Sequence, residues 1–194
     1  MPDPSKQKLI KLGIRLEYLT LGWNVIGVIV VLLSAVSARS IALAGFGFDS
    51  LIEIFASIIV VWQLKRINKD KEHFAERLIG LAFLALALYI SVQIIYVILI
   101  GAHPKHSTIG IIWLSFTALA MLVLAHFKKR TGDAIPNIVL QTESKVTVID
   151  GLLALAVLIG LVMNSLFGLW YADLISAGVI VYYGLKEGIT ALKY

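Results

Sequence analysis

Six long apolar runs, separated by short polar segments, constrain this chain more than any other feature of its sequence. Each run is close to the roughly 20 residues that a helix needs to cross the hydrocarbon core of a bilayer. We therefore expect residues 1–194 to form a single all-α domain, an integral membrane bundle of six transmembrane helices. The expected spans are residues 16–36, 41–64, 78–101, 109–127, 145–167 and 172–192.

The composition leaves too little polar surface for a soluble fold of this size. Hydrophobic residues make up 59% of the chain, and its mean hydropathy is +0.91. A soluble domain is typically about 45–50% apolar, even when glycine is counted as apolar. The chain contains no cysteine, which excludes disulfides and thiolate metal sites. Any metal ion must therefore be held by oxygen or nitrogen, and we expect no resident cofactor.

The net charge of +5 is concentrated in segments that would lie on one side of the membrane. The opposite side carries only Arg39 and Lys105. By the positive-inside rule, both termini should be cytoplasmic, as an even number of spans requires. We interpret the charge as a topology signal and not as a sign of nucleic-acid binding. The basic residues on the cytoplasmic side are Lys6, Lys8, Lys11, Arg15, Lys65, Arg66, Lys69, Lys71, Arg77, Lys128, Lys129, Arg130, Lys186 and Lys193.

Three carboxylates lie inside segments that should be surrounded by lipid. Asp49 and Glu53 are four residues apart in the second span, so they project from one helical face. Asp150 lies in the fifth span. A carboxylate near the bilayer centre costs roughly 3 kcal/mol on insertion scales, so such residues favour a functional role. The alternative is a purely structural role, in which Asp49 and Glu53 form a polar pair within the bundle and Asp150 forms a charge pair with Lys145.

The depths of these carboxylates suggest that they converge. Counted from Ile41, Glu53 lies about 18 Å below the outer surface. Counted from Lys145, Asp150 lies roughly 8–11 Å above the cytoplasmic surface. In a slab of about 30 Å the two depths nearly coincide. Converging oxygen ligands in a dry bundle suit a divalent cation, and the same groups bind protons, so metal and protons would compete for one site.

Four sequence segments resemble the cation diffusion facilitator superfamily, and most closely its short bacterial branch without a cytoplasmic C-terminal domain. GFGFDSLIEIFAS at residues 45–57 is similar to the second-helix motif of the superfamily. LEYLTLGWNV at residues 16–25, ESKVTVIDG at 143–151 and WYAD at 170–173 resemble the first, fifth and sixth helices of that branch. The resemblance implies a homodimer in a bacterial inner membrane. It also implies export of a divalent metal, such as zinc, manganese, iron or cobalt, in exchange for protons.

The resemblance carries the family's metal ligands onto Asp49, Glu53 and Asp150, with one departure. The family places a His or Asp four residues before the last ligand, and that position is Val146 here. Asn24, Ser50 and Thr147 are candidate oxygen donors in its place. An all-oxygen site leans towards harder ions than zinc. For a dimer interface, Gly184 and Gly188 form a small-xxx-small pair on the sixth span.

Other polar residues have more ordinary expected roles. We expect Glu17 to be solvated or interfacial and Asp173 to cap a helix. We expect Glu143 to lie at the cytoplasmic mouth, either as a charge at a helix N-terminus or as a secondary metal-binding residue for metal entry. Asn24 lies deeper on the first span, where it can bond across helices or line the ion path. Membrane lipid is the expected surroundings of the bundle. The sequence predicts a transporter and not an enzyme, because no nucleophile–base pair is readable.

Two alternatives stay open at this level. One is a non-transporting membrane partner or assembly subunit, in which the polar residues only pack helices. The other is an exporter of small organic cations, which expects a wider and more aromatic cavity around an acid than the second and fifth spans offer. Saturable metal binding that depends on Asp49 would separate the metal transporter from the assembly subunit.

Overall fold

The computed structural model describes residues 4–65, 72–101, 103–134 and 138–192, and these residues form six α-helices. The expected all-α architecture is confirmed. The helices extend beyond the predicted spans mainly at the end of the bundle where α1 begins. Their bounds are α1 Pro4–Ala38, α2 Ile41–Lys65, α3 Glu72–Ile100, α4 Thr108–Ala134, α5 Ile138–Phe167 and α6 Tyr171–Leu192.

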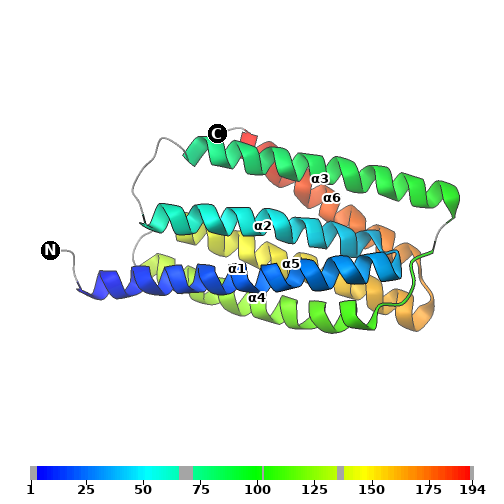
Figure 1. Ribbon diagram of the computed structural model, residues 1–194, viewed down its shortest axis with the longest axis horizontal. Coiled ribbons are helices and arrows are strands. Elements are labelled where there is room, and N and C mark those ends of the chain that lie inside the picture. Colours follow the sequence, from blue (N-terminus) through cyan, green and yellow to red (C-terminus); the bar gives the residue numbers. More distant parts are fainter. Residues whose placement is uncertain (1–3, 66–71, 102, 135–137, 193–194) are drawn as a thin grey trace.

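The helices form two groups that run side by side along the long axis of the molecule (Figure 1). The first group contains α1, α2, α4 and α5, in which α1 packs on α2 and α4, and α5 packs on α4 and α2. The second is the pair α3 and α6, which lies against α2 and α5. As a result, α2 and α5 have neighbours in both groups and carry the residues nearest the centre of the bundle.

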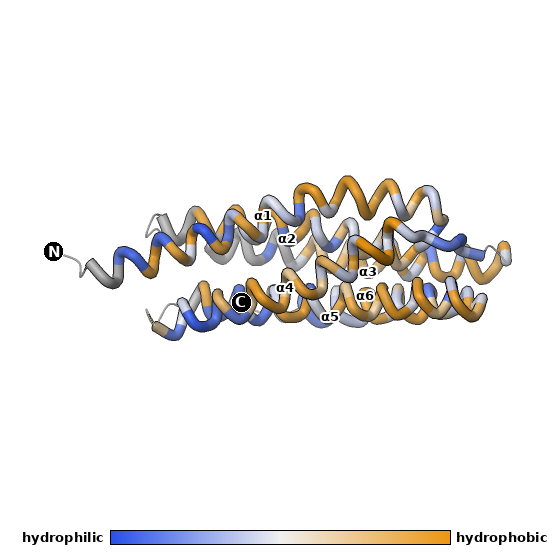
Figure 2. Tube along the Cα trace, turned by 90° about the horizontal axis from the view of Figure 1, so that it is seen from below, coloured by the Kyte–Doolittle hydropathy of each residue, from blue (hydrophilic) through white to orange (hydrophobic). Residues whose placement is uncertain are grey.

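Helix α1 begins and α6 ends at one end of the bundle, where α2 and α4 also end and α3 and α5 begin (Figure 1). Figure 2 shows hydrophilic residues gathered towards that end and apolar residues along most of the remaining length. Among the described residues, five helices are long and apolar enough to cross a membrane, namely α1 to α5. The sixth, α6, falls outside that set and carries Asp173, Lys186 and Glu187. The protein is therefore a multi-pass membrane protein, and we call the end at which α1 begins and α6 ends the cytosolic end, following the charge distribution.

Turns at the opposite end are fixed by local backbone chemistry. Gly101 and Gly168 follow α3 and α5 with φ of 63° and 66°, the left-handed conformation that glycine adopts most easily. Ser107 precedes α4, and its hydroxyl accepts a hydrogen bond from Gly110 N at 3.1 Å. These caps end each helix within one or two residues of the limit expected from hydropathy.

The glycines of α6 do not serve the role expected of them. Gly184 and Gly188 are buried against α3 of the same chain. A Cβ on Gly188 would lie 2.7 Å from Leu84 Cγ and 2.9 Å from the carbonyl oxygen of Gly80. The small residues do permit close approach of two helices, as predicted, but the partner is α3 and not a second subunit.

Candidate functional site

The two acids of α2 both point into the bundle. Asp49 and Glu53 retain only 4% and 3% of their exposure, although both belong to a helix whose Phe48 and Phe55 are exposed. One helical turn separates them, so they form a short ladder along the inner face of α2. The four-residue spacing therefore places both carboxyl groups on one helical face, as predicted, and that face is buried.

Asp150 reaches the same place from α5. It is 7% exposed, and its carboxyl group is close enough to that of Glu53 for the two to interact electrostatically. Asp49 is close enough to Asp150 to interact with it electrostatically. The convergence of the second and fifth spans inferred from depth is thus present. Two neighbouring buried carboxyl groups repel each other when both are ionised, so a proton or a cation is needed to compensate their charge.

Each of the paired carboxyl groups keeps a free oxygen. Glu53 Oε1 and Asp150 Oδ2 are buried and have no hydrogen-bond partner. Buried polar atoms without partners are rare in native proteins and need an explanation, such as a missing ion. As the side chains stand, no group of three or more His, Asp or Glu within the described part of the chain is arranged to hold a metal ion. A metal bound by all three acids would therefore require their carboxyl groups to come closer together.

The proposed replacements for the ligand missing at Val146 have different surroundings. Ser50 is buried, but its hydroxyl donates to the carbonyl oxygen of Phe46 in its own helix at 3.0 Å. Asn24 is also buried, and its Nδ2 has no partner. Thr147 is fully buried on α5 and contacts a lysine, described below. Lys145 is exposed on α5, so the structural ion pair considered for the buried Asp150 is not formed.

Tyr183 of α6 is a polar neighbour that the sequence analysis did not identify. It is 6% exposed, its hydroxyl has no hydrogen-bond partner, and it interacts electrostatically with Asp49, Glu53 and Asp150. Its ring packs edge-on against Phe83 of α3 at 6.2 Å between centroids. The α3–α6 pair thus places a buried phenol within electrostatic range of the carboxylates of the other helix group.

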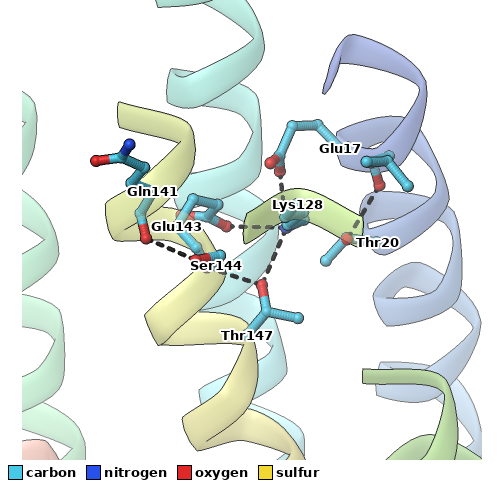
Figure 3. A network of polar contacts seen from close by, with 8 residues as sticks. Glu17, Thr20, Lys128, Gln141, Glu143, Ser144 and Thr147 are labelled. Carbon is cyan, nitrogen blue, oxygen red and sulfur yellow. Dashed lines mark hydrogen bonds and ion pairs between the residues drawn. The ribbon is translucent and has the colours of Figure 1, made fainter. Parts of the chain in front are cut away.

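A second polar cluster lies nearer the cytosolic end and centres on Lys128 of α4 (Figure 3). Lys128 is fully buried, and its Nζ donates to Glu17 Oε2 at 3.1 Å, Glu143 Oε1 at 3.4 Å and Thr147 Oγ1 at 3.0 Å. The cluster joins α1, α4 and α5. We call Glu17, Lys128, Glu143 and Thr147 the inner cluster.

The inner cluster corrects three expectations. Glu17 is not solvated or interfacial, because it is fully buried and paired with Lys128. Lys128 is not one of the surface charges of the cytosolic end. Glu143 is 5% exposed and lies within α5, where it pairs with Lys128 and does not serve as a helix N-terminal charge. The Lys128-Lys129-Arg130 run resembles a solvated loop in sequence. For this reason the burial of Lys128, the first of the three residues, was not predicted.

A signal for Lys128 was nevertheless present in the sequence. Buried residues of α4 recur at three- and four-residue intervals, the spacing of one helical face. They include Leu114, Thr117, Met121, Ala125 and Lys128. Extending the helix past the predicted end of the fourth span would have placed Lys128 on the buried face.

Asp173 caps a helix, as expected, but the helix is α2 and not its own. Its Oδ2 accepts hydrogen bonds from Ile41 N at 3.0 Å and Ala42 N at 3.3 Å, and its Oδ1 accepts one from the Ser40 hydroxyl. A carboxylate at this position satisfies backbone donors that the first turn of α2 leaves free. Asp173 therefore ties α6 to the start of the helix that carries Asp49 and Glu53.

Comparison with known proteins identifies the family. A model of the cation efflux transmembrane domain matches residues 18–194, which is most of the chain and includes Asp49, Glu53 and Asp150. A comparison with curated proteins finds no match. Members of the matched family are cation efflux transporters. The resemblance inferred from the sequence motifs is therefore confirmed, and the chain belongs to the cation efflux, or cation diffusion facilitator, family.

Proposed function

We propose that this protein exports a divalent metal cation from the cytosol in exchange for protons, through a site formed by Asp49, Glu53 and Asp150. The observation that carries the proposal is the meeting of these buried acids from α2 and α5, with free oxygens on Glu53 and Asp150. Three carboxylates are unstable inside an apolar bundle unless a cation or protons compensate their charge. A divalent ion and protons are the two cargoes that do so.

Proton exchange follows from the same pair of residues. Glu53 and Asp150 are neighbouring buried carboxyl groups that repel each other when both are ionised, so one of them should carry a proton when the site holds no metal. A metal ion binds the deprotonated carboxylate, and therefore binding must release that proton. In unbuffered solution, addition of Zn²⁺ to the purified protein should acidify the medium by about one proton per chain. Metal binding without proton release would argue against exchange.

The donor set bears on the choice of metal. The three acids supply carboxylate oxygens, the Tyr183 phenol is within electrostatic range of them, and Val146 offers no ligand atom. Zinc accepts carboxylate ligands but prefers nitrogen and sulfur in tetrahedral sites, whereas manganese suits oxygen. We propose a broad selectivity among zinc, manganese, iron and cobalt.

The assembly and location are part of the same proposal. A homodimer in a bacterial inner membrane is what the family resemblance implies. Its interface must use a surface other than Gly184 and Gly188, because both glycines are buried against α3. Cross-linking in native membranes would test the dimer independently of transport.

The test is metal uptake into inside-out vesicles, in which the cytosolic end faces the medium. Wild-type vesicles should accumulate Zn²⁺ or Mn²⁺ under an outward proton gradient, and Asp49→Asn and Asp150→Asn should abolish uptake while still inserting in the membrane. Asp133→Asn removes an exposed acid of α4 and is the matched control, which should transport normally. Uptake that survives both substitutions would overturn the proposal. Absence of any uptake and of saturable metal binding in the wild type would favour the assembly-subunit alternative.

A further inference from the structure

The inner cluster contains more negative than positive charge. Glu17, Lys128 and Glu143 carry a formal sum of −1 when all three are ionised, and their side chains are almost completely buried. Replacing such a buried ion network by apolar residues of similar size is often neutral or stabilising. Holding α1, α4 and α5 together therefore does not by itself account for it.

The cluster also leaves acceptor atoms unused. Glu17 Oε1 is buried without a hydrogen-bond partner. The Ser57 hydroxyl of α2 lies near the Glu17 carboxyl, but it is outside hydrogen-bonding geometry and also lacks a partner. A single ammonium group with three N–H donors is fully engaged by the three oxygens it contacts (Figure 3). The inner cluster therefore contains more oxygen acceptors than the Lys128 ammonium group can bind.

The position of the cluster places it on the way to the metal site. On α5, Glu143 precedes Asp150 by seven residues, about 10 Å towards the cytosolic end. On α2, Ser57 follows Glu53 by four residues, one turn further in the same direction. Lys128 is close enough to Glu53 to interact with it electrostatically. A cation that travels from the cytosol to Glu53 along this inner face meets the oxygens of the inner cluster first.

We propose that Glu17 and Glu143 form a second cation-binding station on the cytosolic side of the carboxylate site, and that the Lys128 ammonium occupies this station in place of a divalent metal. The inference rests on the proposed function for its place in the transport path. Lysine suits the role because its charge sits on a flexible four-carbon stem and can withdraw. A metal and the ammonium group compete for the same oxygens, so metal can pass only when Lys128 leaves.

The experiment counts metal ions bound to purified protein by equilibrium dialysis with Zn²⁺. Lys128→Ala should bind one more Zn²⁺ per chain than the wild type, because the two acids keep their oxygens and lose their resident cation. The triple variant K128A/E17Q/E143Q should lose the additional ion. Equal numbers for Lys128→Ala and the wild type would overturn the inference.

A second measurement decides the matter if Lys128→Ala does not fold. Glu17→Gln and Glu143→Gln keep the shape of each side chain and should slow vesicle uptake at least tenfold, while the Zn²⁺ affinity controlled by Asp49 stays within twofold of the wild type. Glu187→Gln, on α6, is the matched control. Wild-type uptake by both variants would overturn the inference.

The two proposals fail in different ways. If Asp49 controls neither binding nor uptake, the proposed function fails. The additional ion in Lys128→Ala is measured independently of Asp49, in an Asp49→Asn background, and its presence or absence then still decides whether the second station exists.

Discussion

Removal of the Lys128 ammonium should destabilise the bundle far more than removal of a neighbouring surface charge. In Lys128→Met the apolar stem remains, but Glu17 and Glu143 stay buried without their shared cation. Breaking a buried ion pair by removing one partner typically costs about 3–5 kcal/mol. Because the two acids can partly relieve their repulsion by taking up a proton, we expect a loss of about 3 kcal/mol, at the lower end of that range.

The assay is equilibrium unfolding in mixed micelles of increasing SDS content, followed by tryptophan fluorescence. Trp23 of α1 stacks on Trp113 of α4 at 5.1 Å between ring centroids, and Trp23 Nε1 donates to Thr117 Oγ1 at 3.1 Å. The signal therefore reports the separation of two helices that Lys128 and Glu17 join.

The adjacent residue provides the control. Lys129→Met removes the same charge from an exposed position and should change stability by no more than about 0.5 kcal/mol. If the Lys128 and Lys129 variants differ by less than about 1 kcal/mol, the buried ion network does not contribute as argued here.

Three further predictions concern single contacts. Gly188→Val should separate α3 from α6 and lower the free energy of unfolding by about 1–3 kcal/mol, because its Cβ would lie 2.7 Å from Leu84. Gly178 has open space around it, so Gly178→Ala should fold normally. Equal unfolding midpoints for the two variants would contradict this prediction. Asp173→Ala should cost about 1–2 kcal/mol through the lost cap on α2, measured by the same unfolding assay, and a change below 0.5 kcal/mol would argue against the cap. Tyr183→Phe should weaken Zn²⁺ binding in dialysis without loss of fold, and unchanged affinity would remove the phenol from the site.

Hydropathy and helical spacing were enough to predict the architecture and the acids at its centre. The outer ends of the helices match because caps such as Gly101 and Gly168 coincide with the limits of the apolar runs. The burial of Asp49 and Glu53 follows from their spacing, and their depth relative to Asp150 follows from the rise of a helix. The inner ends were less predictable, because helices such as α1 and α5 continue past the apolar segment into polar sequence.

The features that could not be predicted are contacts that depend on which helices pack against each other. Lys128 and Glu17 are 111 residues apart, so the spacing that places Lys128 on the buried face of α4 does not indicate which acid it pairs with. The α6 glycines show the same limit, since their spacing predicts a close helix contact but does not say with which helix. Asp173 likewise caps a helix that starts 132 residues earlier in the chain. Pairings of this kind come from tertiary packing and leave no periodic pattern in a single sequence.

The central claim is that Asp49, Glu53 and Asp150 bind the transported metal, and anomalous diffraction from crystals soaked in Zn²⁺ tests it most directly. The account predicts a strong peak between α2 and α5, within about 2.0–2.6 Å of carboxylate oxygens, with the three carboxyl groups closer together. The peak should vanish in Asp49→Asn crystals. A peak confined to the exposed His103 and His106, with none between α2 and α5, would contradict the account.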